Sequence, residues 1–227
     1  MVELEHGVVG SRPGAGARER PGPALPPVRD AGGGPPAGIE RPIVLLVDEH
    51  AAIVGQSGKL EAHEPPGLLH LAFSAFLYRS DGRVLLQRRA ASKYHFPLHW
   101  ANACCSHPGP GEQVVESAER RVLEELGVSC ALRPVGVFVY RATCPSSGLV
   151  EHELDHVLVG TTDDEPNPQP SEVAELRWVL PADVAAGRPE GAHAPWLSRA
   201  LEIAEAGRRS GSAELPGAAR APGRRIP

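Results

Sequence analysis

The sequence predicts an α+β fold, an α/β sandwich in which helices flank a mixed β-sheet. Segments of strand length outnumber helical segments between residues 43 and 205. The turn signal Ser80-Asp81-Gly82 separates two of these segments, as in a hairpin. The same region holds one strong amphipathic helix and a second helical stretch near its end. Strands joined by hairpins, with few helices, favour helices packed on a sheet.

The expected strands are apolar runs that end at turn residues. The first is residues 43–47, followed by Asp48. Residues 54–66 are polar with few periodic apolar positions, so a turn and then a loop or short helix is expected there. The remaining expected strands are 69–78, 84–87, 135–141, 151–161 and 175–180.

The clearest helix is expected over residues 112–126. Its apolar positions recur at helical spacing, and Gly127 stands where a helix commonly ends. Before it come a polar loop over 88–99 and an extended segment over 100–107. A last helix is expected over roughly 195–206 and closes the domain.

Glycine and proline are abundant, with 25 and 24 copies in 227 residues, and they gather at the chain ends. Residues 1–42 alone contain nine Gly and eight Pro. Such a segment has too few apolar side chains to offset the entropy of ordering it. The sequence therefore predicts disordered tails over 1–42 and 206–227 around one domain, 43–205.

Composition excludes several classes of protein. The net charge of −5 argues against a dedicated nucleic-acid binder. No run of about 18 apolar residues exists, so no membrane span is expected. The first residues lack the apolar core of a signal peptide, so the chain is expected to be cytoplasmic, with its four cysteines reduced.

Pairs of potential metal ligands occur at close spacing. Cys105 and His107, like Glu151 and Glu153, are two residues apart in extended segments, which puts both members of a pair on one face. Three histidines and two glutamates make a mixed nitrogen and oxygen set that suits Mn, Fe or Zn. The candidates are His63, His70, His107, Glu151 and Glu153. The other histidines, including His95 and His99, are expected to be structural or on the surface.

The helix region carries a second motif. Ser106-x5-Glu112-x7-Arg120-Arg121-Val122-x-Glu124-Glu125-x-Gly127-Val128 resembles the Nudix box, in which acidic side chains hold divalent cations against a diphosphate. Two positions depart from the box, since Ser106 replaces a glycine and Arg121 replaces a glutamate. Losing that acid removes a metal ligand, so diphosphate binding is expected but Nudix-type hydrolysis is disfavoured.

Several further segments resemble type I isopentenyl-diphosphate Δ-isomerases, a family with a Nudix-type fold. They follow one another in family order across residues 43–205. They are Leu69–Ser74, Arg88-Arg89-Ala90-x-Ser92-Lys93, Asn102–Pro108, Tyr140-Arg141-Ala142, Val150–Glu153 and Ala194-Pro195-Trp196.

The resemblance implies an activity and a set of sites. The family interconverts isopentenyl and dimethylallyl diphosphate in isoprenoid biosynthesis, by protonation and deprotonation through a tertiary carbocation. It implies that Cys105 and Glu153 are the acid/base pair, with Tyr140 close to the reacting carbons. Substrate contacts are implied for Lys59, Arg89, Lys93, Arg121 and Trp196.

The resemblance also implies cofactors and excludes one. One Mn²⁺ or Zn²⁺ is implied at the five-residue His/Glu set, and one Mg²⁺ between the diphosphate and Glu125. No flavin is expected, and the chain is expected to act as a monomer on a small prenyl diphosphate. Two rival interpretations are a Nudix hydrolase acting on another diphosphate and a non-catalytic domain with a structural metal. The first is disfavoured by Arg121 and Ser106, and the second leaves Cys105 and Tyr140 without a role.

Overall fold

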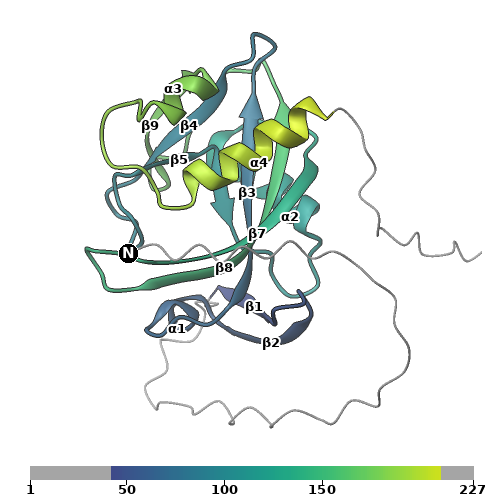
Figure 1. Ribbon diagram of the computed structural model, residues 1–227, viewed down its shortest axis with the longest axis vertical. Helices are drawn as coiled ribbons and strands as arrows, with labels where there is room; N and C mark the ends of the chain where they lie inside the picture. Colours follow the sequence, from purple (N-terminus) through teal and green to yellow (C-terminus); the bar gives the residue numbers. More distant parts are fainter. Residues whose placement is uncertain (1–41, 211–227) are drawn as a thin grey trace, which may run out of the picture.

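The computed structural model describes residues 42–210, and its centre is the long strand β3 (His70–Tyr78). Along its whole length β3 pairs in parallel with β8 (Val150–Thr161), from His70 opposite Glu153 to Tyr78 opposite Thr161. Its antiparallel neighbours include β6 (Cys104–Ser106). The expected mixed sheet is therefore confirmed (Figure 1).

The other strands extend the sheet on both sides of this centre. β7 (Arg133–Thr143) pairs antiparallel with β8, and β9 (Val173–Val179) pairs antiparallel with β4 (Val84–Arg89). β5 (Trp100–Asn102) also lies against β4. The extended segment 100–107 thus consists of two short strands that bind different partners on either side of Ala103.

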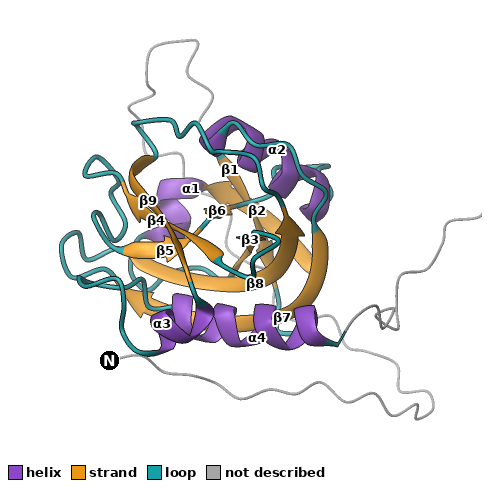
Figure 2. Ribbon diagram, turned by 90° about the horizontal axis from the view of Figure 1, so that it is seen from above, coloured by secondary structure: helices purple, strands orange, loops and turns teal. Residues whose placement is uncertain are grey.

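Helices cover both faces of the strands (Figure 2). On one side lies α2 (Val114–Leu126), whose buried residues join a core with Phe73, Leu77 and Leu158. On the other side lie α3 (Pro181–Ala185) and α4 (Leu197–Arg209), over a core that includes Phe76 and Val157. Residues of β3 alternate between the two cores because side chains alternate along a strand.

The segment expected as a turn and loop contains a strand that the sequence did not predict. β2 (Ile53–Gly58) pairs antiparallel with β1 (Ile43–Val47), and α1 (Lys59–His63) follows it. β2 is an edge strand and mostly exposed, so its sequence carries no apolar alternation. The alternative of a short helix within 54–66 is confirmed by α1.

α2 differs from expectation at its start, and α4, expected over roughly 195–206, begins and ends later than expected. α2 begins at Val114 rather than at 112, and Gly127 ends it in the left-handed conformation, with φ 67°. α4 runs to Arg209, so the boundary at 205 is too early and residues 206–209 are helical rather than tail. The remainder of the expected tails, 1–41 and 211–227, lies outside the described residues. Within 42–210 no helix is both long and apolar enough to cross a membrane.

Glycines allow α4 to pack closely on β7. A Cβ on Gly136 would stand 2.5 Å from Ile203 Cγ2, and one on Gly207 would overlap Val135. Side chains at these two positions would push the helix off the sheet. This close packing brings the start of α4 and Trp196 next to the strands that carry the candidate site.

Candidate active site and metal centre

Three strands and one helix end bring the predicted ligands together on the α4 side of the sheet. Glu151 and Glu153 alternate along β8 and share a face, and His70 lies directly opposite Glu153 on β3. His63 is the last residue of α1, and His107 directly follows β6. Residues far apart in the sequence therefore meet because β8 inserts beside β3.

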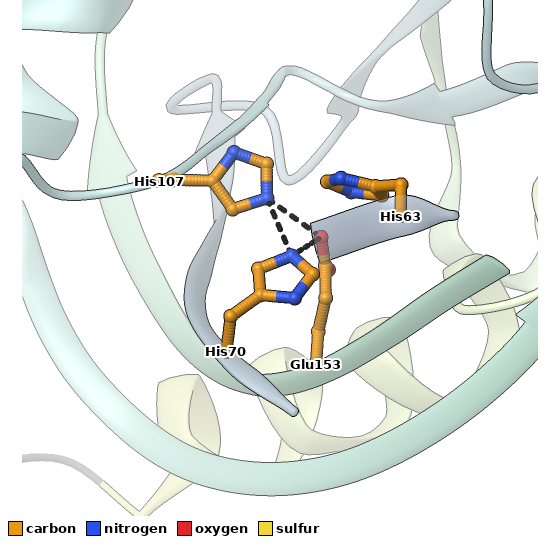
Figure 3. Close-up of side chains that lie close together, drawn as sticks. All are labelled: His63, His70, His107 and Glu153. Atoms are coloured by element: carbon orange, nitrogen blue, oxygen red, sulfur yellow. Dashed lines mark hydrogen bonds and ion pairs between the residues drawn. The ribbon is translucent and has the colours of Figure 1, made fainter. Parts of the chain in front are cut away.

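Four of the five predicted ligands form one compact group (Figure 3). One ligand atom from each of His63, His70, His107 and Glu153 lies within 4.8 Å of the others. His107 Nε2 is 2.8 Å from Glu153 Oε1 and 3.2 Å from His70 Nε2. Atoms bound about 2.1 Å from a shared ion at right angles would be about 3.0 Å apart. The donor set and its spacing fit one divalent cation.

The fifth predicted ligand, Glu151, adjoins this group through His63. His63 Nε2 is 3.1 Å from Glu151 Oε2, and the three residues His63, His95 and Glu151 form a second potential metal group. His95 was expected to have no role, yet its Nδ1 is 3.1 Å from Glu151 Oε1. The histidine between the two glutamates, His152, is not in either group; its Nδ1 is 3.2 Å from Gly67 O.

Both glutamates are held as carboxylates. Burial and the neighbouring Glu153 oppose ionisation of Glu151, but hydrogen bonds from His63 and His95 lower its pKa to about 2. Burial likewise opposes ionisation of Glu153, but contacts with His70 and Tyr140 hold its pKa well below the usual range. Deprotonated carboxylates beside imidazole nitrogens are suited to binding a metal ion.

Cys105 lies on the same side of the sheet as the metal group. Its thiol donates to Asn102 Oδ1 at 2.9 Å, and burial raises its pKa to about 12. Arg89, nearby, opposes that rise only in part. The neighbouring Cys104 faces the other way, into the core under α2. The two adjacent cysteines thus have different surroundings, and only Cys105 adjoins the candidate site.

Aromatic side chains enclose the region beside Cys105. The Tyr140 hydroxyl donates to Glu153 Oε2 at 2.6 Å. The Tyr140 and Trp196 rings are 5.7 Å apart, and those of Phe96 and Trp196 are 5.6 Å apart. The Trp196 indole donates to Asn102 Oδ1 at 3.0 Å, the same oxygen that Cys105 contacts. Tyr140 and Trp196 are buried, and the partly buried Cys105 packs against the core to which they belong.

The predicted cations meet at the edge of the site around one acid, Glu172. Lys93 forms an ion pair with Glu172, and Arg121 Nη2 is 3.7 Å from its Oε1. Arg121 also binds buried Glu125 at 2.5 Å. Burial, above all, raises the pKa of Glu125, and Arg121 counteracts it. Among residues 42–210, no hydrogen bond or ion pair joins Glu125 to the His/Glu group.

The two remaining predicted cations, Lys59 and Arg89, form no hydrogen bond or ion pair with Glu172 among the described residues. Lys59 starts α1, and burial and then the charge of Lys93 lower its pKa. The Arg89 guanidinium lies 5.8 Å from the Trp196 ring centre, and its Nε donates to His95 O at 3.1 Å. Arg89 therefore sits between the aromatic wall and the loop that carries His95.

Sequence reasoning missed several contributors. Asn102 stood inside a quoted motif but was given no role, His95 was expected to be structural or on the surface, and Glu172 was not singled out. Asp155, the third acid on the same face of β8, accepts from Ser74 at 2.7 Å, and burial raises its pKa well above the usual range. The only signal available for Asp155 was its two-residue spacing from Glu153. His95 and Glu172 lie in loops, where no period marks a side chain's direction.

Comparisons with known proteins agree with this architecture. Residues 68–200 match the NUDIX domain family. Solved structures with the same fold include DR0079 from Deinococcus radiodurans, with a TM-score of 0.53 and 25% identity, covering 75% of this chain and 99% of that one. A MutT protein from Methanosarcina mazei, 17% identical, has a TM-score of 0.51 over 64% of this chain and 96% of its own.

Relatives in sequence are considerably closer. The isopentenyl-diphosphate Delta-isomerase of Nocardia farcinica is 55% identical over 168 residues, which cover 73% of this chain and 96% of the relative. The enzyme of the same name from Streptomyces coelicolor is 44% identical over 71% of this chain and 83% of its own length. The chain therefore belongs to the NUDIX domain family and, within it, to the isopentenyl-diphosphate Delta-isomerases.

Proposed function

We propose that this protein interconverts isopentenyl diphosphate and dimethylallyl diphosphate for isoprenoid biosynthesis. One observation carries the proposal: the partly buried thiol of Cys105 and the buried carboxylate of Glu153, with its hydroxyl partner Tyr140, lie on one face of the sheet beside an aromatic wall. Moving a double bond by one carbon requires one proton to be added and another removed. The site offers a group for each task.

The chemistry follows from the protonation states of these groups. A proton added to the terminal alkene carbon leaves a tertiary carbocation, and loss of a proton from the carbon on the other side of the cation forms the new double bond. Cys105 is held as a thiol and Glu153 as a carboxylate, so one can donate while the other accepts. The reverse reaction uses the same pair with the roles exchanged.

The aromatic wall suits a cationic intermediate. Tyr140 and Trp196 belong to the core against which Cys105 packs, and a desolvated cation over the face of such a ring gains about 2 kcal/mol. Phe96 closes the wall on the far side of Trp196. Water would capture the carbocation, so its exclusion protects the reaction as well as strengthening the electrostatics.

The His/Glu set would hold one divalent ion, which we assign as Mn²⁺ or Zn²⁺. His63, His70, His107, Glu151 and Glu153 would bind it. When bound, such an ion fixes the Glu153 carboxylate and lowers its affinity for a proton. The mixed nitrogen and oxygen donors support this choice over a cysteine-rich structural site.

The cation cluster would hold the diphosphate. Lys59, Arg89, Lys93 and Arg121 offer the charges, and Arg guanidinium groups bind phosphate oxygens in bidentate fashion. Glu125, whose carboxylate lies 2.5 Å from Arg121, would hold an Mg²⁺ against the diphosphate, because Mg²⁺ prefers carboxylate and phosphate oxygens as ligands. We further expect the protein to act in the cytoplasm as a monomer, with no nucleic-acid partner.

The test is isotope incorporation. Purified protein is incubated with isopentenyl diphosphate, Mg²⁺ and Mn²⁺ in deuterated water, and the products are analysed by mass spectrometry and for free phosphate. The proposal requires dimethylallyl diphosphate that carries deuterium, with no phosphate release. Phosphate release without isomerisation would instead identify a Nudix hydrolase, and a stoichiometric flavin in the purified protein would contradict the metal-dependent route.

A further inference from the structure

His95 lies beside the proposed metal centre without belonging to the predicted ligand set. Its ring is buried, with 4% of its surface exposed, and its centre is 4.1 Å from that of His63. Its Nδ1 lies 3.1 Å from Glu151 Oε1, while His63 Nε2 lies 3.1 Å from Glu151 Oε2. The two imidazoles therefore contact different oxygens of one carboxylate.

The loop between β4 and β5 places His95 by several independent contacts. The His95 carbonyl accepts a hydrogen bond from Arg89 Nε at 3.1 Å. The next residue, Phe96, has a φ of 42° and donates its backbone N–H to Cys144 Sγ at 3.1 Å. A left-handed conformation at a bulky residue is kept only where surrounding contacts impose it. These contacts hold the backbone at His95 and Phe96, and so fix the point from which the imidazole extends.

The tautomer of His95 follows from its neighbours. A ring nitrogen beside a carboxylate oxygen carries the hydrogen, so Nδ1 is the donor to Glu151. The other nitrogen, Nε2, is buried and has no hydrogen-bond partner among the described residues. The only polar contact of the imidazole that the described residues supply is thus directed at Glu151.

We propose that His95 is a positioning residue of the metal centre: it holds Glu151 Oε1 so that Oε2 stays turned toward His63 and the ion. This inference rests on the proposed function, since it presumes the ion at the His/Glu set. His95 forms the second potential metal group with His63 and Glu151, but its Nδ1 carries the hydrogen that it donates to Glu151 Oε1, so His95 acts through Glu151 rather than as a further ligand. Groups that orient a ligating carboxylate commonly change metal affinity by about 10–100-fold.

The experiment measures metal affinity directly and does not depend on turnover. Full-length protein is stripped with EDTA and titrated with Mn²⁺ against a chromophoric chelator, for wild type and for His95→Ala, His95→Asn and His95→Gln. Asn places its amide N–H₂ near the position of Nδ1, whereas Gln places it near Nε2. His99→Ala is the matched control, because His99 lies in the same loop but directs its Nδ1 to Pro97 O at 2.9 Å.

The expected result is a pattern across the variants. His95→Ala and His95→Gln should bind Mn²⁺ about 10–100-fold more weakly than wild type, and His95→Asn should recover most of the affinity. His99→Ala should match wild type. Thermal unfolding of the metal-free proteins shows which variants fold. If His95→Ala does not fold, the Mn²⁺ affinities of His95→Asn and His95→Gln still show whether the donor at the Nδ1 position is the one required.

Three outcomes would overturn the inference in distinguishable ways. Equal affinity of wild type and His95→Ala would mean that His95 does not position Glu151. Recovery by Gln but not by Asn would mean that Nε2 is the working atom. A wild type that binds neither Mn²⁺ nor, in a parallel titration, Zn²⁺ would contradict the metal centre, and with it this inference and that part of the proposed function. The other two outcomes leave the proposed function intact.

Discussion

At the scale of single residues, the structure separates two adjacent cysteines that the sequence shows only as a pair. Cys104 and Cys105 occupy successive positions of β6, so their side chains point to opposite faces of the sheet. Cys104 is fully buried in the core under α2, and Cys105 packs against the core that contains Tyr140 and Trp196. Cys104 therefore has a packing role, and the proposed proton transfer can involve only the Cys105 sulfur.

This separation predicts different effects for three substitutions. Cys105→Ala and Glu153→Gln should each lower kcat by about 10²–10⁴-fold, because each removes one partner of the proton transfer. Cys104→Ala should keep turnover and lose about 1 kcal/mol of unfolding free energy to a small cavity. Steady-state kinetics and denaturant unfolding measure these effects. Comparable losses of turnover in all three variants would mean that the acid/base assignment is wrong.

Asn102 connects the thiol to the aromatic wall. Its Nδ2 donates to the carbonyls of Ala75 and Cys104, at 3.1 and 2.9 Å, which fixes the direction of the amide. Its Oδ1 must then accept from both Cys105 and Trp196. One oxygen thus orients both the Cys105 thiol and the Trp196 indole. The sequence did not predict that Asn102 and Trp196 would contact the thiol in this way.

Removing this amide should affect chemistry more than substrate binding. Asn102→Ala should lower kcat while leaving KM nearly unchanged, since the cations expected to bind diphosphate do not contact Asn102. The variant also loses about 1–3 kcal/mol of stability from the buried groups it leaves unpaired. Trp196→Phe, which removes the indole donor and leaves a smaller aromatic ring, serves as the comparison. A raised KM with unchanged kcat would contradict a positioning role.

At the scale of elements, Glu112, the first acid of the Nudix box, connects the loop before α2 to the helix itself. Glu112 precedes the helix and accepts from the Gly109 backbone N–H at 2.8 Å, and Arg120 binds the same carboxylate at 2.8 Å. The Glu112 carboxylate thus links the loop at Gly109 to Arg120, in the second turn of α2. In this chain the first acid of the box closes the loop rather than facing the His/Glu group.

This contact gives the stability of α2 a dependence on pH. The Gly109 N–H, then Ser117 and Arg120, hold the pKa of Glu112 below 4.5, its ordinary value. A lowered pKa means that the stabilisation is fully present above pH 4.5 and is lost as the pH falls through the folded-state pKa. Glu112→Gln should therefore be less stable than wild type at pH 7, and the difference should shrink below pH 4.5.

Thermal unfolding at a series of pH values measures this difference. Glu116→Gln, an exposed glutamate in the first turn of the same helix, is the matched control and should show a smaller effect. A stability gap between Glu112→Gln and wild type that stays constant from pH 7 to pH 3 would exclude the ionised carboxylate as its source.

At the scale of the whole molecule, α4 closes the site side of the sheet and extends further than its sequence suggested. Its last turn holds Gly207 against Val135, and the Arg208 guanidinium lies 4.9 Å from the centre of the Tyr78 ring. Arg133 also donates to the Gly207 carbonyl at 3.3 Å. These contacts hold the C-terminal end of α4 against the sheet, while Trp196 precedes its N-terminal end.

Two truncations should therefore differ. A chain of residues 42–210 is expected to keep the kcat/KM of the full-length protein, because it contains every proposed site residue and the whole of α4. A chain that stops at residue 205 should unfold several degrees lower, since it lacks the turn that packs on β7. Activity assays and thermal unfolding compare the two. Loss of turnover in the longer chain would show that the terminal segments contribute to function.

Local patterns in the sequence were sufficient for most elements and for much of the site. Apolar runs marked β3 and β8, helical spacing with Gly127 marked α2, and ordered motifs marked Cys105 and the ligand set. Each of these signals depends on near neighbours in the chain or on a repeated spacing. The exposed edge strand β2 and the last turn of α4 escaped because neither has an apolar repeat of its own; partners elsewhere in the chain stabilise them.

Tertiary structure alone decided which loop residues reach the site. The parallel pairing of β8 with β3 puts Glu153 opposite His70, and the loop after β4 then brings His95 onto the free oxygen of Glu151. Glu172 meets Lys93 and Arg121 for the same reason. A sequence of side chains determines periods, caps and motifs, but contacts between distant loops depend on strand order, which only the assembled sheet establishes.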